Sequence, residues 1–214
     1  MPEARTAVHA ATLGEVAELR SNVRVVDVAT APLLSIEACD ELVASCATDG
    51  WKVAARKGGT SADALSGVEL APFVDPATKS RLEQPLPGGA SGSFAELIST
   101  RVLAINAEVY RFRVVGIEEP TRVMCYRGAY ADHAREHVDL GPLHPLRKLA
   151  FSVLLTDPDT FDGGDLEFSG TTFDAARVQG TVTVFPSFLP HRVTPVERGV
   201  RHAVVGWVLG PTFV

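Results

Sequence analysis

Short runs rich in valine, phenylalanine and leucine recur through the second half of this chain, and they limit its fold more than any other feature. The clearest are TRVMCY (121–126), KLAFSVLLT (148–156), DLEF (165–168), TVTVF (181–185) and RHAVVGWVL (201–209). The segments between them, such as DPDTFDGG and FPSFLP, have the composition of turns. Short strands at this spacing predict a β-sandwich or a rolled barrel after about residue 113.

One of these turns contains two adjacent glycines. We expect Gly163 and Gly164 to adopt positive φ in a hairpin, because glycine has no steric penalty there. No helix start follows them, so the pair is not a phosphate-binding loop.

The first half of the chain has helical patterns. Ser35 is a candidate cap for a helix through IEACDELVASCATDG, which Gly50 would end. The residues expected on its buried face are Ile36, Leu42, Val43 and Cys46. The apolar spacing of residues 94–112 predicts a longer helix that faces the core.

Strands and a loop are expected between these helices. VRVVDV (23–28) and WKVAA (51–55) have strand patterns, and PLPGGASGS (85–93) has the composition of a loop. We therefore expect a single domain over residues 1–214, with a helix-rich part (1–112) and a β-rich core (113–214). Helices that cover one face of a sheet are a common single-domain arrangement.

Composition limits the partners. With 46% hydrophobic and 21% charged residues the chain is typical of a globular protein, and its net charge of −6 argues against nucleic acid as a partner. The N-terminus lacks the apolar stretch of a secretory signal, and no segment approaches a membrane-spanning length. We expect a cytoplasmic protein without a membrane partner. Its scattered cysteines (Cys39, Cys46 and Cys125) are expected to be small buried hydrophobes.

The segment HAREHVD (133–139) allows two interpretations. As a helix, it places His133 and His137 on one face, a spacing that zinc proteases use. Those proteases need a glutamate directly after the first histidine, and Ala134 stands there instead. As a strand end, the segment projects His137 and Asp139 to one side.

The strand interpretation requires a third ligand. His191, at the start of another strand-like run, could return to the same place. Two imidazoles and one carboxylate form the facial triad associated with non-haem Fe(II) oxygenases, which leaves the opposite positions of the metal open.

The order of these motifs resembles that of the Fe(II)- and 2-oxoglutarate-dependent dioxygenases, in particular the prolyl-4-hydroxylase-like branch. The resemblance extends from about Ser35 to Leu209 and is most specific from Arg122 onward, through YRGAY, HVD, FDGGDLEF and FPSFLPHRVTPVERGVRHAVVGW. It implies an α+β, mainly β fold with a double-stranded β-helix (jelly-roll, cupin-like) core. It also implies Fe(II), with 2-oxoglutarate and O2 as cosubstrates.

Carried over position by position, the resemblance assigns His137, Asp139 and His191 to iron. Arg201 matches the basic residue that binds the distal carboxylate of 2-oxoglutarate. A guanidinium suits that role, because it can hold a carboxylate through two parallel hydrogen bonds.

Two aromatic residues complete the implied cosubstrate site. Trp207 matches an aromatic wall and Tyr126 a tyrosine that reaches the cosubstrate. Extra residues before His137 leave open whether Tyr126 or Tyr130 points inward. Where some relatives place a second tyrosine against the cosubstrate, this chain offers Ser152.

The implied function is a 2-oxoglutarate-dependent hydroxylase that oxidises an unactivated C–H bond and releases succinate and CO2. Related enzymes that halogenate replace the carboxylate ligand, whereas Asp139 is present here. Desaturation, epoxidation and cyclisation by the same scaffold remain alternatives. A non-catalytic jelly-roll binding module is a further one, against which the retained triad and Arg201 both argue.

The substrate is left open between a small molecule, an amino acid and a peptidyl side chain, and the oligomeric state is also open. Residues 56–68 and 83–93 are candidate lids over the metal. Arg122, Arg127 and Arg135 are candidate anchors for a carboxylated substrate.

Overall fold

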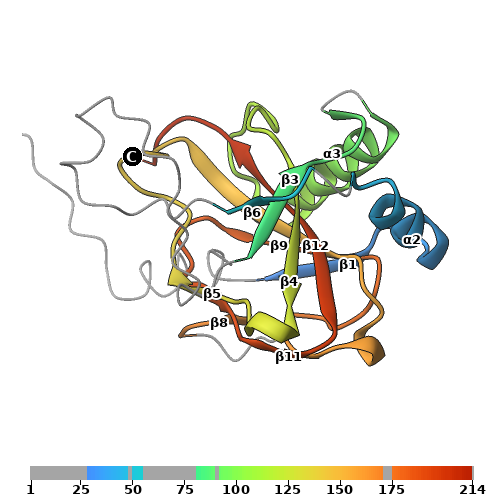
Figure 1. Cartoon of the computed structure of the whole chain (residues 1–214). Helices are drawn as coiled ribbons and strands as arrows, with labels where there is room; N and C mark the ends of the chain where they lie inside the picture. Colours follow the sequence, from blue (N-terminus) through green and yellow to red (C-terminus); the bar gives the residue numbers. More distant parts are fainter. Residues whose placement is uncertain (1–27, 48–49, 55–80, 90–91, 171–174, 214) are drawn as a thin grey trace, which may run out of the picture.

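The computed structural model describes residues 28–47, 50–54, 81–89, 92–170 and 175–213. The largest element that they build is a seven-stranded antiparallel sheet (Figure 1). Its strands, in spatial order, are β1 (Ala29–Pro32), β9 (Thr181–Pro186), β6 (Arg147–Leu154), β12 (Val200–Leu209), β4 (Arg122–Arg127), β3 (Leu82–Pro85) and β2 (Lys52–Val53).

A smaller β layer faces this sheet. It contains β5 (Ala134–His137), β10 (His191–Val193) and β8 (Leu166–Phe168), and a short pair formed by β11 (Val196–Arg198) and β7 (Asp162–Gly163). Short 3-10 helices, η3 (Gly128–Tyr130) and η4 (Pro158–Thr160), lie in the connections. The two facing layers form a double-stranded β-helix, as predicted.

The glycine pair does not form the expected hairpin. Gly163 and Gly164 do have positive φ, 67° and 68°. However, β7 pairs with β11 and β8 pairs with β10, so the two glycines bend one continuous strand path between those partners. The bend brings Gly163 close to the opposite chain, where an added Cβ would lie 2.1 Å from the carbonyl oxygen of Pro195.

Helix α2 (Ile36–Ala44) begins where predicted, with the Ser35 hydroxyl accepting a hydrogen bond from the Ala38 N–H at 3.2 Å. It ends at Ala44, well before Gly50, because the Ser45 and Cys46 N–H groups close the last turn. Cys39 and Leu42 form its buried face, whereas Ile36 is 58% exposed, contrary to the expectation.

Helix α3 (Ser93–Ile105) continues into a π-helical turn, η2 (Asn106–Tyr110), which ends at Arg111 with a φ of 56°. The predicted helix over 94–112 is therefore confirmed to within a few residues. The Tyr110 hydroxyl donates to the Val184 carbonyl at 2.6 Å and accepts from the Ala29 N–H at 3.1 Å. These bonds attach the end of the helical segment to β9 and β1.

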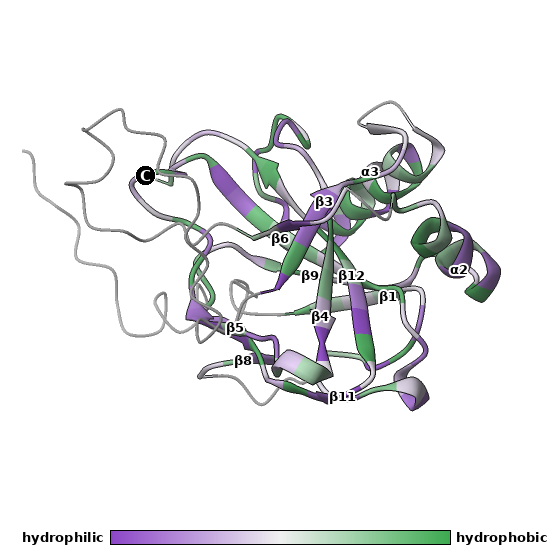
Figure 2. Cartoon of the chain, viewed as in Figure 1, coloured by the Kyte–Doolittle hydropathy of each residue, from purple (hydrophilic) through white to green (hydrophobic). Residues whose placement is uncertain are grey.

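The main core lies between the helices and the outer face of the large sheet. Ile98, Val102 and Ile105 of α3 pack in one cluster with residues such as Val184 and Val204. Strands of this sheet carry both hydrophobic and hydrophilic segments in Figure 2, as expected when their two faces meet different surroundings. The helices thus cover one face and leave the other for the site.

The remaining sequence expectations have mixed outcomes. The strand expected over 23–28 lies almost entirely outside the described residues, and Val28 precedes β1. The strand expected over 51–55 is reduced to β2 (Lys52–Val53).

Burial raises the pKa of the Cys39 and Cys125 thiols to about 11, which suits inert hydrophobic residues, while Cys46 is only partly buried. Within the described ranges, no helix has the length and apolarity needed to cross a bilayer.

Candidate metal centre

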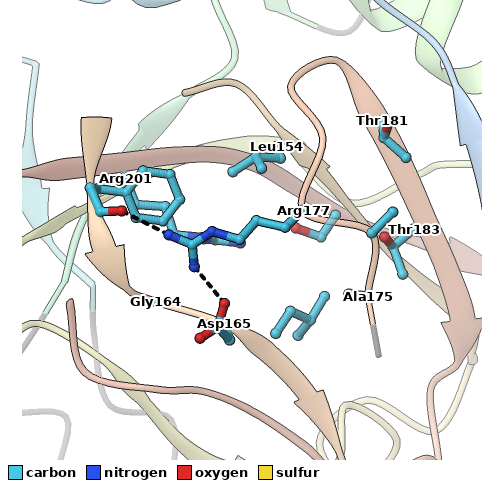
Figure 3. A pocket seen from close by; sticks show the side chains of 12 residues that line it. Leu154, Gly164, Asp165, Ala175, Arg177, Thr181, Thr183 and Arg201 are labelled. Atoms are coloured by element: carbon cyan, nitrogen blue, oxygen red, sulfur yellow. Dashed lines mark hydrogen bonds and ion pairs between the residues drawn. The ribbon is translucent and has the colours of Figure 1, made fainter. Parts of the chain in front are cut away.

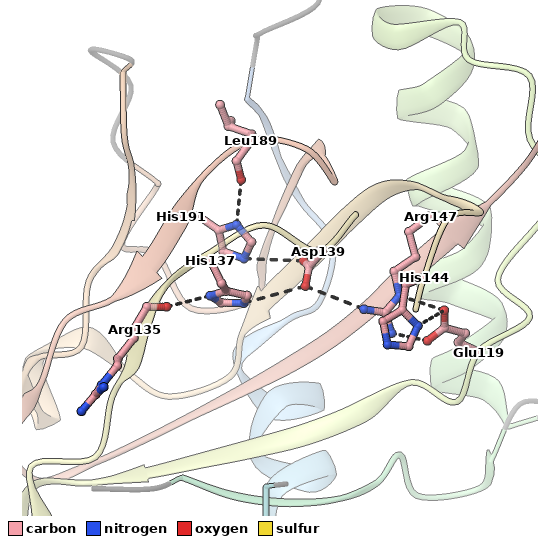
Figure 4. A network of polar contacts seen from close by, with 8 residues as sticks. All are labelled: Glu119, Arg135, His137, Asp139, His144, Arg147, Leu189 and His191. Atoms are coloured by element: carbon pink, nitrogen blue, oxygen red, sulfur yellow. Dashed lines mark hydrogen bonds and ion pairs between the residues drawn. The ribbon is translucent and has the colours of Figure 1, made fainter. Parts of the chain in front are cut away.

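Three side chains that commonly bind metals converge between the two β layers. One candidate ligand atom from each of His137, Asp139 and His191 lies within 4.8 Å of the other two. The Nε2 atoms of His137 and His191 are 3.8 and 3.5 Å from the Oδ1 and Oδ2 atoms of Asp139 (Figure 4). The donor set is two imidazoles and one carboxylate.

The β pairing explains this convergence. His137 ends β5, His191 begins β10, and the two residues are direct partners in the antiparallel ladder, with ring centroids 4.3 Å apart. Asp139 follows β5, and its N–H donates to the Ser187 carbonyl at 2.8 Å. The helical interpretation of HAREHVD is therefore wrong, because β5 occupies its centre and His133 contacts the Ala131 carbonyl instead.

Main-chain carbonyls set the direction of both imidazoles. His137 Nδ1 lies 2.7 Å from the Arg135 oxygen, and His191 Nδ1 lies 2.9 Å from the Leu189 oxygen. Because a carbonyl oxygen only accepts, each Nδ1 carries the proton and donates it. Each Nε2 then presents a lone pair toward Asp139, as a metal ligand requires.

The electrostatics of His191 favour the same neutral form. Burial is the largest influence and lowers the pKa of His191, while Asp139 opposes this effect and His137 adds to it. A neutral imidazole binds a metal without first losing a proton. His137 lies at the exposed side of the cluster.

A buried arginine supports the carboxylate from behind. Arg147 is 4% exposed, and its Nη1 lies 3.9 Å from Asp139 Oδ1. Its Nε donates to Glu119 Oε1 at 2.8 Å, and a second N–H group bonds to the other Glu119 oxygen (Figure 4). Its guanidinium also stacks 3.6 Å from the centroid of the Trp207 ring. Held on both sides, Arg147 restricts the orientation of Asp139.

Sequence reasoning missed this arrangement. Arg147 directly precedes the strand expected over 148–156, and Glu119 lies in an irregular segment 28 residues away. No local pattern joins residues at that separation, so the pairing becomes visible only in the fold.

A cavity of about 630 Å³, open to solvent, adjoins the three ligands. One wall is the inner face of the large sheet, where residues two apart on a strand point to the same side. Strand β4 contributes Arg122, Met124 and Tyr126, and β12 contributes Arg201, Val205 and Trp207.

Arg201 lies deep in this cavity and is 5% exposed. Its guanidinium carbon is 5.2 Å from the centroid of the Tyr126 ring. Among the described residues, no carboxylate lies within ion-pairing distance of it. Burial lowers the pKa of Arg201, while Tyr126 and Asp165 oppose this effect. A buried cation without an anionic partner is suited to binding an anion.

A second cavity of about 360 Å³ shares Arg201 and Ser152 with the first. Figure 3 shows Thr181 and Thr183 on the side opposite Arg201, with Arg177 between them. Arg177 donates to Asp165 and to the Phe161 carbonyl at 2.5 and 2.7 Å. Hydroxyl groups and a paired arginine therefore surround Arg201 on this side.

Gly164 makes room for Arg201. An added Cβ at Gly164 would lie 2.9 Å from Arg201 Cδ and 2.9 Å from Val196 Cγ2. The sequence identified this glycine through its turn conformation, whereas the structure shows that it also permits close packing against the arginine.

The structure distinguishes the two candidate tyrosines. Tyr126 is buried and lines the cavity, whereas Tyr130 is 59% exposed and lies under the Arg127 guanidinium. Trp207 also lines the cavity, and its buried Nε1 has no hydrogen-bond partner among the described residues. His202 points away, as expected from strand alternation, with its ring centroid 5.8 Å from that of Trp51.

The expected substrate anchors are paired or exposed, although Arg122 does line the cavity. Arg122 pairs with Glu83, Arg127 pairs with Asp132 at 2.8 Å, and Arg135 is exposed outside the cavity. Residues 56–68 lie outside the described part of the chain. Of the second candidate lid, residues 83–85 belong to β3 and are not a lid.

Known proteins similar in sequence to this chain match the region that contains the three candidate metal ligands. Residues 121–209 match the sequence model of the family described as 2OG-Fe(II) oxygenase superfamily. A PKHD-type hydroxylase of Teredinibacter turnerae is 40% identical over 96 residues, which cover 42% of this chain and 42% of that protein. One of Hyphomonas neptunium is 41% identical over 63 residues, or 28% of each chain. The chain thus spans less than half the length of the curated relatives it matches.

Solved structures agree over a longer range. A Pseudomonas putida prolyl-4-hydroxylase superposes with a TM-score of 0.61 at 19% identity, covering 92% of this chain and 99% of that one. The viral collagen prolyl hydroxylase of Paramecium Bursaria Chlorella virus-1 gives 0.59 at 16% identity, with 86% and 96% coverage. At these identities the likeness concerns the fold.

The matched region contains the three converging ligands and Arg201, and the fold match extends beyond it. Residues 121–209 are therefore similar in sequence to the 2OG-Fe(II) oxygenase superfamily, and the chain shares the fold of prolyl-4-hydroxylases.

Proposed function

We propose that this protein is an Fe(II)- and 2-oxoglutarate-dependent hydroxylase. The observation that carries the proposal is the pairing, in one cavity, of the ligand cluster with the buried, carboxylate-free Arg201. Neither feature alone is specific to this class of enzyme. Together they match the two requirements of its chemistry, a metal with open positions and a cation for the cosubstrate.

The family implies Fe(II), 2-oxoglutarate and O2, and the donor set fits the metal. His137, Asp139 and His191 would hold Fe(II) through two imidazole nitrogens and one carboxylate, which leaves positions free for other ligands. When bound, the iron supplies the oxidising chemistry, in which 2-oxoglutarate and O2 yield succinate, CO2 and one hydroxyl group on the substrate.

The protein contributes orientation. Arg201 would bind the distal carboxylate of 2-oxoglutarate, with Tyr126 beside it and Trp207 as a wall of the cavity. Met124 and Val205 line the same space with apolar surface, which limits water near the metal. Arg147 would keep Asp139 oriented toward the iron.

The reaction outcome follows from the ligand set. Retention of Asp139 favours hydroxylation over halogenation, because a halide needs the position that the carboxylate occupies. Desaturation, epoxidation or cyclisation would require a particular substrate geometry, and a product analysis separates them. The proposed substrate is a small molecule, an amino acid or a peptidyl side chain.

Two further properties belong to the proposal. Helices α2 and α3 share one core with the large sheet, which supports a single domain over residues 1–214. The unpaired state of Cys39, Cys46 and Cys125 supports a reducing compartment, and we place the protein in the cytoplasm.

The test is succinate formation. Protein purified without oxygen receives Fe(II) and 2-oxoglutarate, and succinate is measured after O2 is admitted. We expect the wild type to form succinate, His137→Ala to form none, and Arg201→Ala to need at least tenfold more 2-oxoglutarate, since a charge-assisted hydrogen bond contributes about 1.5–3 kcal/mol.

Matched controls separate these roles from general damage. His133→Ala removes a histidine of the same segment outside the ligand cluster, and Arg198→Ala removes an exposed arginine near Arg201. Both should retain wild-type succinate formation. A wild type that binds no Fe(II) and forms no succinate would contradict the proposal.

A further inference from the structure

The cations that line the main cavity differ in their partners. Arg122 is paired with Glu83, and the proposed function uses Arg201 for the cosubstrate. Arg81 also lines this cavity, and no carboxylate of the described residues lies within ion-pairing distance of it. Its buried Nε has no hydrogen-bond partner within the same part of the chain. The Nε of Arg81, beside the metal site, is therefore available to a ligand.

The strand geometry places Arg81 toward the cavity. Arg81 directly precedes β3, and it lies two residues before Glu83, so the two side chains leave the strand path on the same side. Glu83 is the cross-strand partner of Met124, and both line the cavity. Because Leu82 pairs with Cys125, the register places Arg81 beside Tyr126, which also lines the cavity.

Arg81 is also near the metal ligands. It lines the same cavity as His137, Asp139 and His191. A group bound by Arg81 would therefore lie in the same cavity as the iron, on the side of β3. Arg201 approaches from β12, so the two arginines occupy different parts of the wall.

The chemistry of a guanidinium selects the group that it binds. Leaving a buried donor unsatisfied costs free energy, and a carboxylate satisfies Arg through two parallel hydrogen bonds. The cavity that Arg81 shares with the metal ligands has apolar walls, which include Met124, Phe185 and Val205, and these suit a short aliphatic stem. An internal peptide segment offers no main-chain anion to this position.

We propose that Arg81 binds the carboxylate of a small free acid and so directs an aliphatic C–H bond of that substrate toward the iron. The substrate class is a short aliphatic carboxylic acid or a free amino acid, rather than an internal peptide residue that has no side-chain carboxylate. This inference rests on the proposed function and adds a specificity-determining residue to it.

The experiment measures binding separately from turnover. Protein loaded with Fe(II) and 2-oxoglutarate without oxygen is titrated by calorimetry with short aliphatic carboxylic acids, free amino acids, and the primary amide of each. At least one acid should bind, and at least tenfold more tightly than its amide. Arg81→Gln should abolish this preference, and Arg81→Lys should restore part of it.

The matched control is Arg135→Gln. It removes the same charge from an exposed residue near the site, and Figure 4 shows its side chain pointing away from the ligands. Acid binding should be unchanged in this variant. Affinity for 2-oxoglutarate should be unchanged in Arg81→Gln, which separates the Arg81 role from that of Arg201.

Several outcomes would overturn the inference. They are failure of every acid to bind, equal affinity for acids and amides, and an acid preference that survives Arg81→Gln. Succinate formation by the wild type in any of these cases leaves the proposed function standing while the Arg81 role falls. A wild type without Fe(II) binding or succinate formation removes both.

Discussion

At the scale of single residues, the candidate site depends on groups that orient the ligands rather than on the ligands alone. The Arg135 and Leu189 carbonyls determine which nitrogen of each imidazole is free, and Arg147 determines how the Asp139 carboxylate is turned. Such supporting contacts commonly change metal affinity by tenfold to about a hundredfold. They are therefore measurable without any substrate.

Arg147→Met tests this support. Loss of the guanidinium frees the Asp139 carboxylate, so we expect affinity for Co(II), used in place of Fe(II), to fall at least tenfold. Calorimetry gives the affinity, and the visible spectrum of bound Co(II) should change with ligand geometry. Arg147→Lys, which keeps the charge, should recover part of the affinity.

Loss of Arg147 also leaves Glu119 without its bidentate partner, which lowers stability independently of the metal. The double variant Glu119→Gln/Arg147→Met removes that carboxylate charge. A double variant that folds normally and still binds Co(II) weakly supports the orienting role. Wild-type affinity and spectrum in Arg147→Met would show that Asp139 needs no such support.

At the scale of secondary-structure elements, the bend between β7 and β8 connects the smaller β layer to the cosubstrate side of the cavity. Gly164, with a φ of 68°, turns the chain and lies against Arg201. Gly170 has a φ of 77°, and a Cβ added there would have no atom within 4 Å among the described residues. The two glycines thus share a conformation and differ in their surroundings.

The different surroundings of the two glycines can be tested by comparing the variants Gly164→Ala and Gly170→Ala. Both should lose about 1 kcal/mol of unfolding free energy from a Cβ at positive φ, measured by denaturant unfolding. Gly164→Ala should lose more than Gly170→Ala, because its Cβ also meets Arg201 and Val196. Because only the first methyl group meets Arg201, the KM for 2-oxoglutarate should rise in Gly164→Ala alone. An equal KM in both variants would refute the packing role of Gly164.

The elements also show what sequence patterns can and cannot reveal. Strands such as β4, β9 and β12 were predictable because each lies in a short β-type run bounded by turn residues, and the Ser35 cap was predictable because capping is local. Strand β3 (Leu82–Pro85) has no such pattern, so Arg81 at its start was missed. Pairings over long separations, such as Glu119 with Arg147, depend on the folded chain.

The candidate site residues were also only partly predictable from local sequence. His137 and Asp139 were recognisable by local spacing, and His191 could be added only through motif order or the family resemblance. The choice between Tyr126 and Tyr130 depended on how the chain turns after β4, where η3 directs Tyr130 to solvent. Local chemistry identifies candidates, and the fold decides which of them meet.

At the scale of the whole molecule, a histidine on the opposite face of β12 links folding to pH. Burial and then the charge of Arg201 lower the pKa of His202 below its ordinary value of 6.5. The unfolded chain therefore binds a proton more readily than the folded chain. Stability from neutral His202 is present above pH 6.5 and is lost as the pH falls below it.

His202→Phe keeps a ring against Trp51 and removes the titration. We expect the unfolding free energy of the wild type to fall more steeply with acid below pH 6.5 than that of the variant, by at most about 1.4 kcal/mol per pH unit. Urea unfolding at a series of pH values measures the two slopes. Parallel slopes would mean that His202 titrates alike in both states.

The whole fold brings the ligand cluster of the smaller layer and Arg201 of the large sheet to one cavity, and the central claim is that they act together on one cosubstrate. The most direct measurement is calorimetric titration of 2-oxoglutarate, without oxygen, into protein with and without Fe(II). We predict binding that strengthens with Fe(II) and weakens at least tenfold in Arg201→Ala. Binding that is indifferent to both Fe(II) and Arg201 would contradict this claim.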